Sequence, residues 1–219
     1  MVQSSIAWTR GGDEVAVTTE KGRRTRQRIV EATALQILDA GIDGTSLDDV
    51  RAATLTSKSQ LFHYFPGGKA ELVREVALWE GEQLLAAQEP HLSDLSTWES
   101  WAAWRRGLEE YYLGRGRWAC PIGSLTAQTA AADEETAAFL RAAWTGWRTR
   151  LADGVRRMQA AGEIDPAADP DRLAASVLAS IQGGLLLSQP ERASWPLEAA
   201  LDAAWTTLHA LRPTATPTT

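Results

Sequence analysis

Apolar residues recur every three or four positions along most of the chain, which is the spacing of one face of an α-helix. Ala, Leu, Glu, Arg and Gln dominate, and no alternating run of apolar and polar residues indicates a β-strand. The pattern therefore predicts an all-α fold of about nine helices. The seven helices expected outside residues 45–69 cover residues 23–40, 69–89, 94–113, 124–132, 134–161, 171–188 and 196–211.

Two short apolar segments between residues 45 and 69 are separated by only a few residues. Thr45 or Ser46 is placed to cap the first helix, and Thr56 or Ser57 is placed to cap the second. Neither segment carries enough apolar surface to be stable alone, so the preceding helix must cover both. A helix followed by two short ones joined by a tight turn is the helix-turn-helix plan, whose last helix enters the major groove of DNA.

The second short segment, "SKSQLFHYF", separates its polar from its apolar residues. Lys58, Ser59, Gln60 and His63 are left for the groove. Lysine donates to guanine acceptors, glutamine bonds adenine through two atoms, and serine accepts either base. The apolar side chains of both short helices are expected to point inward, namely Leu47, Val50, Ala53, Leu61, Phe62 and Phe65.

The net charge of −6 is unusual for a protein that binds nucleic acid, but the charge is unevenly distributed. Residues 1–69 carry nine Lys or Arg against eight Asp or Glu, and the rest of the chain carries thirteen against twenty. A local basic footprint is what DNA binding requires. Five basic residues fall within eight positions and are expected beside the phosphates or in the minor groove, namely Lys21, Arg23, Arg24, Arg26 and Arg28.

Phosphate contacts are expected at both ends of the helix-turn-helix segment. Tyr64, Lys69 and the amides at the start of the next helix suit a phosphate, helped by the helix dipole. Thr45 or Ser46 is placed to touch phosphate from the first short helix. The candidate DNA-binding residues are Arg24, Thr45, Ser46, Ser57, Lys58, Ser59, Gln60, His63, Tyr64 and Lys69.

Residues 23–76 resemble the DNA-binding domain of TetR/AcrR-family transcriptional regulators. The matching segments are "RIVEAT", "G-x-x-G-T-S-L-D-D-V", "SK-x-x-LFHYF" and "K-x-E-L", in this order. The resemblance implies an all-helical homodimer that binds a near-palindromic operator, usually as a repressor, and releases it when a small molecule enters the C-terminal bundle. Two features depart from the family pattern. Leu55-Thr56 replaces a Gly-Val-like pair in the turn, and "PGGK" is one residue longer than "PSK" before Lys69.

The resemblance also sets the expected domains. Residues 1–20 form a flexible arm, and residues 21–68 form the helix-turn-helix domain. Residues 69–212 form the domain for ligand binding and dimerisation, and residues 213–219 form a tail. Within the larger domain, "ACPIGSLTAQTA" is similar to a "CP-x-G-S-L" segment in a branch of the family related to LmrA/YxaF-type regulators, which places Cys120 beside the ligand-binding bundle.

Ten tryptophans in 219 residues raise the possibility of an aromatic ligand pocket in the C-terminal bundle. Core packing explains most of them, and the alternative is a cavity between helices for a small, flat, largely apolar molecule. Four residues between 101 and 111 share one helical face, and two tryptophans lie three apart on the long helix expected nearby. The candidate ligand-binding residues are Trp101, Trp104, Leu108, Tyr111, Cys120, Trp144 and Trp147.

The segment "VLASIQGGLLLSQ" keeps two adjacent glycines, Gly183 and Gly184, inside a predicted helix. Glycine weakens a helix by about 1 kcal/mol relative to alanine, so their presence indicates a close approach of another helix. The helices at 171–188 and 196–211 are the candidate dimer interface, which the family resemblance favours over the alternative of an internal core.

Several classes of function lack a signal in the sequence. No nucleophile, phosphate-loop or dinucleotide motif is found, so neither an enzyme nor a cofactor is expected. The three histidines have no metal-site spacing. A single cysteine and the absence of an apolar signal or membrane segment favour the cytoplasm. Two alternatives stay open: a DNA-binding regulator controlled by a protein partner, and a fold relative that no longer reads DNA.

Overall fold

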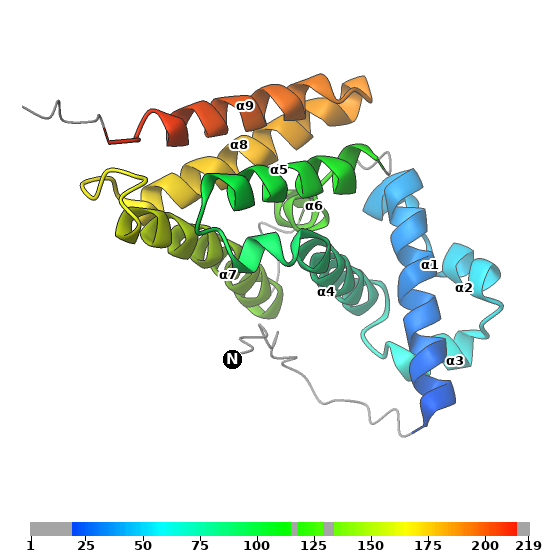
Figure 1. Ribbon diagram of the computed structural model, residues 1–219. Coiled ribbons are helices and arrows are strands. Elements are labelled where there is room, and N and C mark those ends of the chain that lie inside the picture. The colour runs from blue at the N-terminus through cyan, green and yellow to red at the C-terminus, as the bar shows by residue number, and fades with distance from the viewer. Residues whose placement is uncertain (1–18, 115–117, 129–133, 214–219) are drawn as a thin grey trace, which may run out of the picture. The chain divides into compact units, whose positions relative to one another are not determined.

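The computed structural model describes residues 19–114, 118–128 and 134–213 (Figure 1). These residues form nine α-helices and one short 3-10 helix, and none of them is in a strand, which confirms the predicted all-α fold. No helix within these ranges is both long and apolar enough to cross a membrane. The helices are α1 (Glu20–Gly44), α2 (Leu47–Thr54), α3 (Lys58–Tyr64), α4 (Gly68–Gln88), η1 (His91–Ser93), α5 (Trp98–Leu113), α6 (Pro121–Gln128), α7 (Glu134–Ala160), α8 (Pro170–Glu191) and α9 (Trp195–His209).

The chain divides into two compact units. The first contains α1, α2, α3, α4 as far as Glu82, and the first residues of α7. The second contains the end of α4 and the remaining helices. The division therefore falls within α4, whereas the predicted domain boundary lies at its first turn.

A single apolar cluster holds the first unit together. Ile29 and Val30 from α1 meet Val50 from α2, and all three are almost completely buried. Leu61 on α3 and Phe65 at its C-terminal end are fully buried in the same cluster. Each such side chain contributes about 1.5–3 kcal/mol relative to an exposed one, so α1 is what keeps the two short helices folded.

The ends of these helices follow the predicted capping signals. Gly41 interrupts α1 with φ 75° and ψ 171°, close to the expected stop. Ser46, rather than Thr45, caps α2 and forms a capping box with Asp49. Ser57 caps α3 and forms a second capping box with Gln60. Each box satisfies two backbone N–H groups that would otherwise lack a partner.

Two apolar positions on the short helices are not where the pattern places them. Phe62 is 39 % exposed and Ala53 is exposed, whereas both were expected to point inward. Thr54 is buried instead, and its hydroxyl donates to the Val50 carbonyl at 2.7 Å. A seven- or eight-residue helix presents only a narrow face to the core, and its neighbouring apolar positions lie beyond that face.

Within the second unit, three tryptophan N–H groups bond to partners inside the bundle. Trp101 donates to the Leu95 carbonyl at 3.1 Å, and Trp104 donates to the Gln88 side chain at 2.7 Å. Trp144 donates to the Thr126 hydroxyl at 3.0 Å. These bonds join α4 to α5 and α6 to α7, so the tryptophans act here as structural links.

Two helix starts in this unit differ from the prediction. The helix expected from residue 94 begins at Trp98, because the Thr97 hydroxyl accepts the Ser100 N–H at 3.1 Å and caps it there. Residues 91–93 form the separate η1 turn. The short helix expected from residue 124 begins earlier, at Pro121. Proline is well suited to the first turn of a helix, which the sequence analysis did not use.

Helices α8 and α9 lie side by side along most of their length (Figure 1). Gly184 makes this packing possible. A Cβ atom at Gly184 would lie 2.8 Å from the Cβ of Ala200 and 2.9 Å from the Cα of Leu197. The neighbouring Gly183 has no atom within 4 Å of that position and is exposed. The close helix approach predicted from the glycine pair is thus made by Gly184.

Candidate nucleic-acid interface

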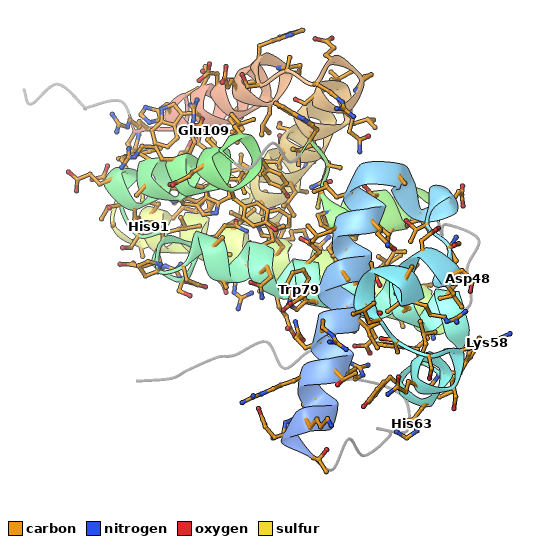
Figure 2. The ribbon with its side chains drawn as sticks, turned by 90° about the vertical axis from the view of Figure 1, so that its right-hand side faces the viewer. Asp48, Lys58, His63, Trp79, His91 and Glu109 are labelled. Carbon is orange, nitrogen blue, oxygen red and sulfur yellow. The ribbon has the colours of Figure 1, made fainter. Side chains whose placement is uncertain are left out.

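Helix α3 presents a surface without carboxylates. Its sequence from Lys58 to Tyr64 contains no Asp or Glu, and Lys58, Ser59 and His63 are all exposed. Figure 2 shows Lys58 and His63 pointing away from the ribbon of α3. Within the described part of the chain, Lys58 has no ion pair. No carboxylate among the residues that the structure describes therefore competes with a base or a phosphate for the ammonium group.

Gln60 is exposed, but the capping box occupies half of its amide. Its Oε1 atom accepts the Ser57 backbone N–H at 3.1 Å, and the Ser57 hydroxyl accepts the Gln60 N–H at 3.1 Å. A bidentate bond to adenine needs both the oxygen and the nitrogen of the amide. In this conformation Gln60 keeps both of its side-chain N–H donors and one lone pair on Oε1, and Ser57 keeps its hydroxyl hydrogen and one lone pair.

The two candidates before α2 differ in accessibility. Thr45 is 4 % exposed, and its hydroxyl donates to the Gly41 carbonyl at 2.8 Å. Ser46 is exposed, and its hydroxyl donates to the Asp49 carboxylate at 2.5 Å. That bond lowers the pKa of Asp49. Ser46 is therefore the more accessible of the two, but its hydroxyl must leave Asp49 before it can donate to a phosphate, whereas Thr45 closes the end of α1.

The junction between α3 and α4 carries the other phosphate candidates. Tyr64 and Lys69 are both partly exposed, and the Tyr64 ring meets the His63 ring edge-on at 5.1 Å. The backbone amides expected to be free here are partly used. Gly68 donates to the Phe65 carbonyl at 3.0 Å, and Gly67 donates to the Glu71 carboxylate at 2.7 Å. The Lys69 side chain is thus a stronger phosphate candidate than these amides.

The basic start of α1 is held by one carboxylate. Glu20 pairs with Arg23 and, at 3.0 Å, with Arg24, whose side chain is 78 % exposed. These hydrogen bonds lower the pKa of Glu20. Lys21 and Arg28 are exposed on the same helix. Surface pairs of this kind are weak, so the two arginines remain available to a polyanion.

Arg26 has a structural position that the sequence analysis did not single out from the basic run. Its guanidinium pairs with Glu75 on α4 at 2.8 Å, and both side chains are largely buried, at 22 % and 17 % exposed. The same group lies 5.0 Å from the centre of the Phe65 ring. Arg26 therefore joins α1 to α4 and braces the end of α3. No feature of the sequence distinguishes it from its exposed neighbours.

The candidate ligand residues lie in the second unit, and nearly all are buried. Trp101, Trp104, Leu108 and Tyr111 are between 0 % and 3 % exposed, as expected for one face of α5. Trp147 on α7 is 4 % exposed. The rings of Trp144 and Trp147 are parallel to within 3°, with centroids 6.3 Å apart.

Cys120 is buried beside Tyr112, Gln182 and the Gly123 amide. Burial raises the pKa of its thiol, although the hydrogen bond from the Gly123 amide, at 3.4 Å, opposes the shift. A protonated, buried thiol is a poor nucleophile, and it behaves as a small apolar side chain. Cys120 therefore lies where α5, α6 and α8 meet, and its expected role beside a ligand stays a prediction.

Two family models match the chain. The model described as bacterial regulatory proteins, tetR family, matches residues 29–76. The model described as tetracyclin repressor-like, C-terminal domain, matches residues 98–204. The first match covers most of α1 together with α2, α3 and the first part of α4, and the second covers α5, α6, α7 and α8 with most of α9.

A curated relative and two solved structures resemble the chain over most of its length. An uncharacterised HTH-type transcriptional regulator in the lacX 3' region of Lactococcus lactis subsp. lactis is 28% identical over 174 residues, covering 75% of this chain and 83% of the relative. The regulatory protein TetR from Rhodobacter sphaeroides superposes with a TM-score of 0.75 at 23% identity, covering 84% and 98%. A TetR transcriptional regulator from Chloroflexus aurantiacus J-10-FL superposes with a TM-score of 0.75 at 24% sequence identity, and the match covers 90% of this chain and 100% of that one.

Proposed function

The chain belongs to the TetR family of DNA-binding transcriptional regulators, and we propose that it is a dimeric repressor released from its operator by a small molecule. The family is one of regulators rather than enzymes. The proposal adds three things: a two-fold dimer on a near-palindromic operator, an effector in the C-terminal bundle, and a loss of DNA affinity when the effector binds. Because its ligand is DNA, the protein is placed in the cytoplasm.

The observation that carries the proposal is the position of α3. It is anchored by fully buried Leu61 and Phe65, and it exposes Lys58, Ser59 and His63 from a face without carboxylates. In a helix-turn-helix, this helix lies in the major groove, where such side chains reach base edges. Gln60 takes part through its N–H donors and the free lone pair of Oε1, in the orientation that the capping box fixes.

Phosphate contacts then fix the register of the protein on DNA. Lys69 and Tyr64 serve one side of α3, and Ser46 serves the start of α2. Arg24, whose side chain is exposed on α1, supplies a longer-range contact to the DNA backbone. These groups set affinity and its salt dependence, whereas the side chains on α3 set sequence preference.

The dimer is assigned to α8 and α9. Leu186 and Leu187 on α8 are 67 % and 59 % exposed, and Trp195 at the start of α9 is 57 % exposed. Three large apolar side chains on two packed helices form an apolar surface of the kind that dimers cover. A two-fold axis through this surface pairs each helix with its copy, and a symmetric dimer requires two related half-sites in DNA.

Helix α4 is the proposed link between effector and DNA. It is continuous from Gly68 to Gln88. In the first unit Glu75 is paired with Arg26, and in the second unit Gln88 accepts the Trp104 N–H at 2.7 Å. An effector that displaces Trp104 pulls on Gln88, and the bond at Glu75 passes the movement to the helices that hold α3. The effector thus favours a conformation with lower DNA affinity.

The test is fluorescence anisotropy of the full-length protein with DNA from upstream of its own gene and with scrambled DNA, at several salt concentrations. We expect sequence-selective binding that weakens steeply with salt. If both DNAs bind equally and weakly, the operator would next be sought by selection from random DNA. Failure of that selection as well would contradict a DNA-reading role. A small molecule that releases the selected operator would separate this proposal from control by a protein partner.

A further inference from the structure

Three hydrogen-bond donors on α7 are buried without an acceptor, and two of them, on Trp147 and Arg150, lie close together near the middle of the helix, whereas the third, Arg157 Nε, lies near its end. Trp147 is 4 % exposed, and its Nε1 atom has no hydrogen-bond partner. Arg150 lies three residues further along, and its Nη1 atom is likewise buried and unpartnered. Residues three apart lie on one face of a helix. Buried donors of folded proteins nearly always have partners, so a pair of exceptions on one face calls for an explanation.

The bundle supplies acceptors to comparable tryptophans. The N–H groups of Trp101, Trp104 and Trp144 each bond to an oxygen atom within 3.1 Å. Trp147 is as deeply buried as the first two. Its missing partner is therefore not a general property of tryptophan in this core, and it marks a place where the chain itself provides no acceptor.

The charge of Arg150 is also incompletely balanced. Burial lowers its pKa, and the carboxylate of Glu89 opposes the shift. That carboxylate accepts the Ser93 N–H at 3.1 Å and the Ser93 hydroxyl at 2.8 Å, which closes the η1 turn. Among the described residues, no carboxylate lies within ion-pair distance of Arg150. The guanidinium has lost part of its water without gaining a direct counter-charge.

Two stacked indole rings accompany these donors. The Trp144 and Trp147 rings are parallel to within 3°. Both belong to the α7 stretch that ends at Arg150. Aromatic rings stack on such rings, and a carboxylate accepts from both an indole N–H and a guanidinium. The indole rings and the two donors together fit a molecule that carries both an aromatic ring and a carboxylate.

We infer that the α7 face of Trp144, Trp147 and Arg150 binds a planar aromatic acid as the effector. The carboxylate accepts from Arg150 Nη1 and Trp147 Nε1, and the ring packs on the indoles. This inference rests on the proposed ligand response and changes the expected chemistry of the ligand. The tryptophans alone predict a largely apolar molecule, whereas the unpartnered donors require an acidic group on it.

The experiment compares probes with matched rings, measured by isothermal titration calorimetry on the full-length protein. The first pair is 2-naphthoate and 2-methylnaphthalene, and the second is benzoate and toluene for a smaller cavity. We expect at least one acid to bind about tenfold more tightly than its neutral partner, because hydrogen bonds to charged groups are the strong ones. Equal affinities in both pairs, or no detectable binding of either acid at its solubility limit, would overturn the inference.

Two variants locate the site. Trp147→Phe keeps a ring and removes the N–H, and Arg150→Met keeps the stem and removes the charge. Each should lower the affinity for the acid about tenfold and leave the neutral probe unchanged. Arg148→Met is the control, because Arg148 is exposed on the same helix and should have no effect. Acid binding that is unaffected in both test variants would contradict the site.

A melting temperature separates binding from a structural role. Removing a buried donor that has no partner should leave the melting temperature of Trp147→Phe and Arg150→Met unchanged or raised. A marked fall in both would instead indicate that these groups stabilise the fold. An acid that binds as expected but leaves operator binding intact would support this site and contradict the proposed ligand response. Release of the operator by a neutral probe alone would support the proposed ligand response and contradict this site.

Discussion

Leu55 lies in the turn between α2 and α3 with φ 52° and ψ 37°, the left-handed region that favours glycine. Its side chain is 91 % exposed, so no buried contact compensates for the strain. The neighbouring Thr56 is 5 % exposed and bonds to the Thr54 hydroxyl at 2.8 Å. The turn therefore keeps a backbone suited to glycine while carrying a leucine.

Replacing Leu55 with glycine should stabilise the first unit. The left-handed conformation costs a residue with a Cβ atom about 1–2 kcal/mol, and the greater freedom of glycine in the unfolded chain offsets about half of this. We expect Leu55→Gly to raise the free energy of unfolding by about 0.5–1 kcal/mol in urea denaturation. Leu55→Ala, which keeps the Cβ atom, is the control. A glycine variant less stable than the alanine variant would disprove the strain.

His209 is packed among aromatic rings at the end of α9. Its ring centre lies 4.2 Å from that of Trp98 and 4.5 Å from that of Trp205, and the Arg212 guanidinium lies 4.4 Å from the Trp98 ring. Burial, and then the positive charge of Arg212, lowers the pKa of His209 below its ordinary value of 6.5. The folded protein therefore favours the neutral imidazole.

The pH dependence of stability follows from this direction. The contribution of His209 is fully present above the unfolded pKa of about 6.5, and it is lost as the pH falls from there towards the lower folded pKa. Urea unfolding midpoints should therefore decrease between about pH 7.5 and 5.5, and His209→Gln should show a smaller decrease. If the urea midpoints of the wild type and of His209→Gln decrease equally with falling pH, His209 has the same pKa in the folded and the unfolded chain, which contradicts this account.

At the scale of the helix, the two glycines of α8 provide a matched pair of substitutions. A Cβ atom at Gly184 would lie 2.8 Å from the Ala200 Cβ and 3.1 Å from the Pro196 carbonyl oxygen, and one at Gly183 would meet nothing. We expect Gly184→Ala to lower the free energy of unfolding by about 1–3 kcal/mol, because α9 must move away. Gly183→Ala should raise it by about 0.5–1 kcal/mol through helix propensity. Urea unfolding at one protein concentration compares them, and equal effects would contradict the packing of α8 on α9.

Helix boundaries show what the sequence was able to predict. Gly41, Ser46 and Ser57 mark ends within the first unit because glycine and capping side chains act through neighbouring residues. Long helices such as α7 were placed within a residue, since many turns average the periodic signal. The start of α5 was placed four residues early, because apolar Leu95 continues the pattern although it lies in the segment between η1 and α5.

The candidate site was less predictable than the fold. The position of Phe62 depends on how far α3 is rotated against the core, and a seven-residue helix leaves that angle open. The link from Arg26 to Glu75 joins residues 49 positions apart, and nothing local marks it. The unpartnered Trp147 donor is a property of the assembled bundle. Such features depend on contacts that periodicity and capping do not encode.

At the scale of the molecule, the exposed leucines of α8 test the proposed dimer. Leu186→Glu places a charge on the apolar surface and should convert the dimer to a monomer in sedimentation equilibrium. A monomer reaches only one half-site, so operator affinity should fall about a hundredfold or more. Leu35→Glu is the control, because Leu35 is 65 % exposed on α1, which belongs to the first unit. A Leu186→Glu protein that stays dimeric would place the interface elsewhere.

The uneven charge also belongs to this scale. The protein carries a net charge of −6, yet the carboxylate-free surface of α3 and the basic start of α1 lie in the first unit. The acidic remainder repels DNA, and this repulsion favours contact through the first unit alone. Binding is therefore expected to be sensitive both to salt and to single charges on α3.

The most direct measurement of the central claim is the operator affinity of Lys58→Ala compared with Arg148→Ala. Both substitutions remove one exposed positive charge, but only Lys58 lies on α3. If α3 reads DNA, Lys58→Ala should lose about 1–3 kcal/mol, roughly 5- to 150-fold, and relax sequence preference, whereas Arg148→Ala should match the wild type. Equal affinity of both variants and the wild type for the operator would contradict the claim.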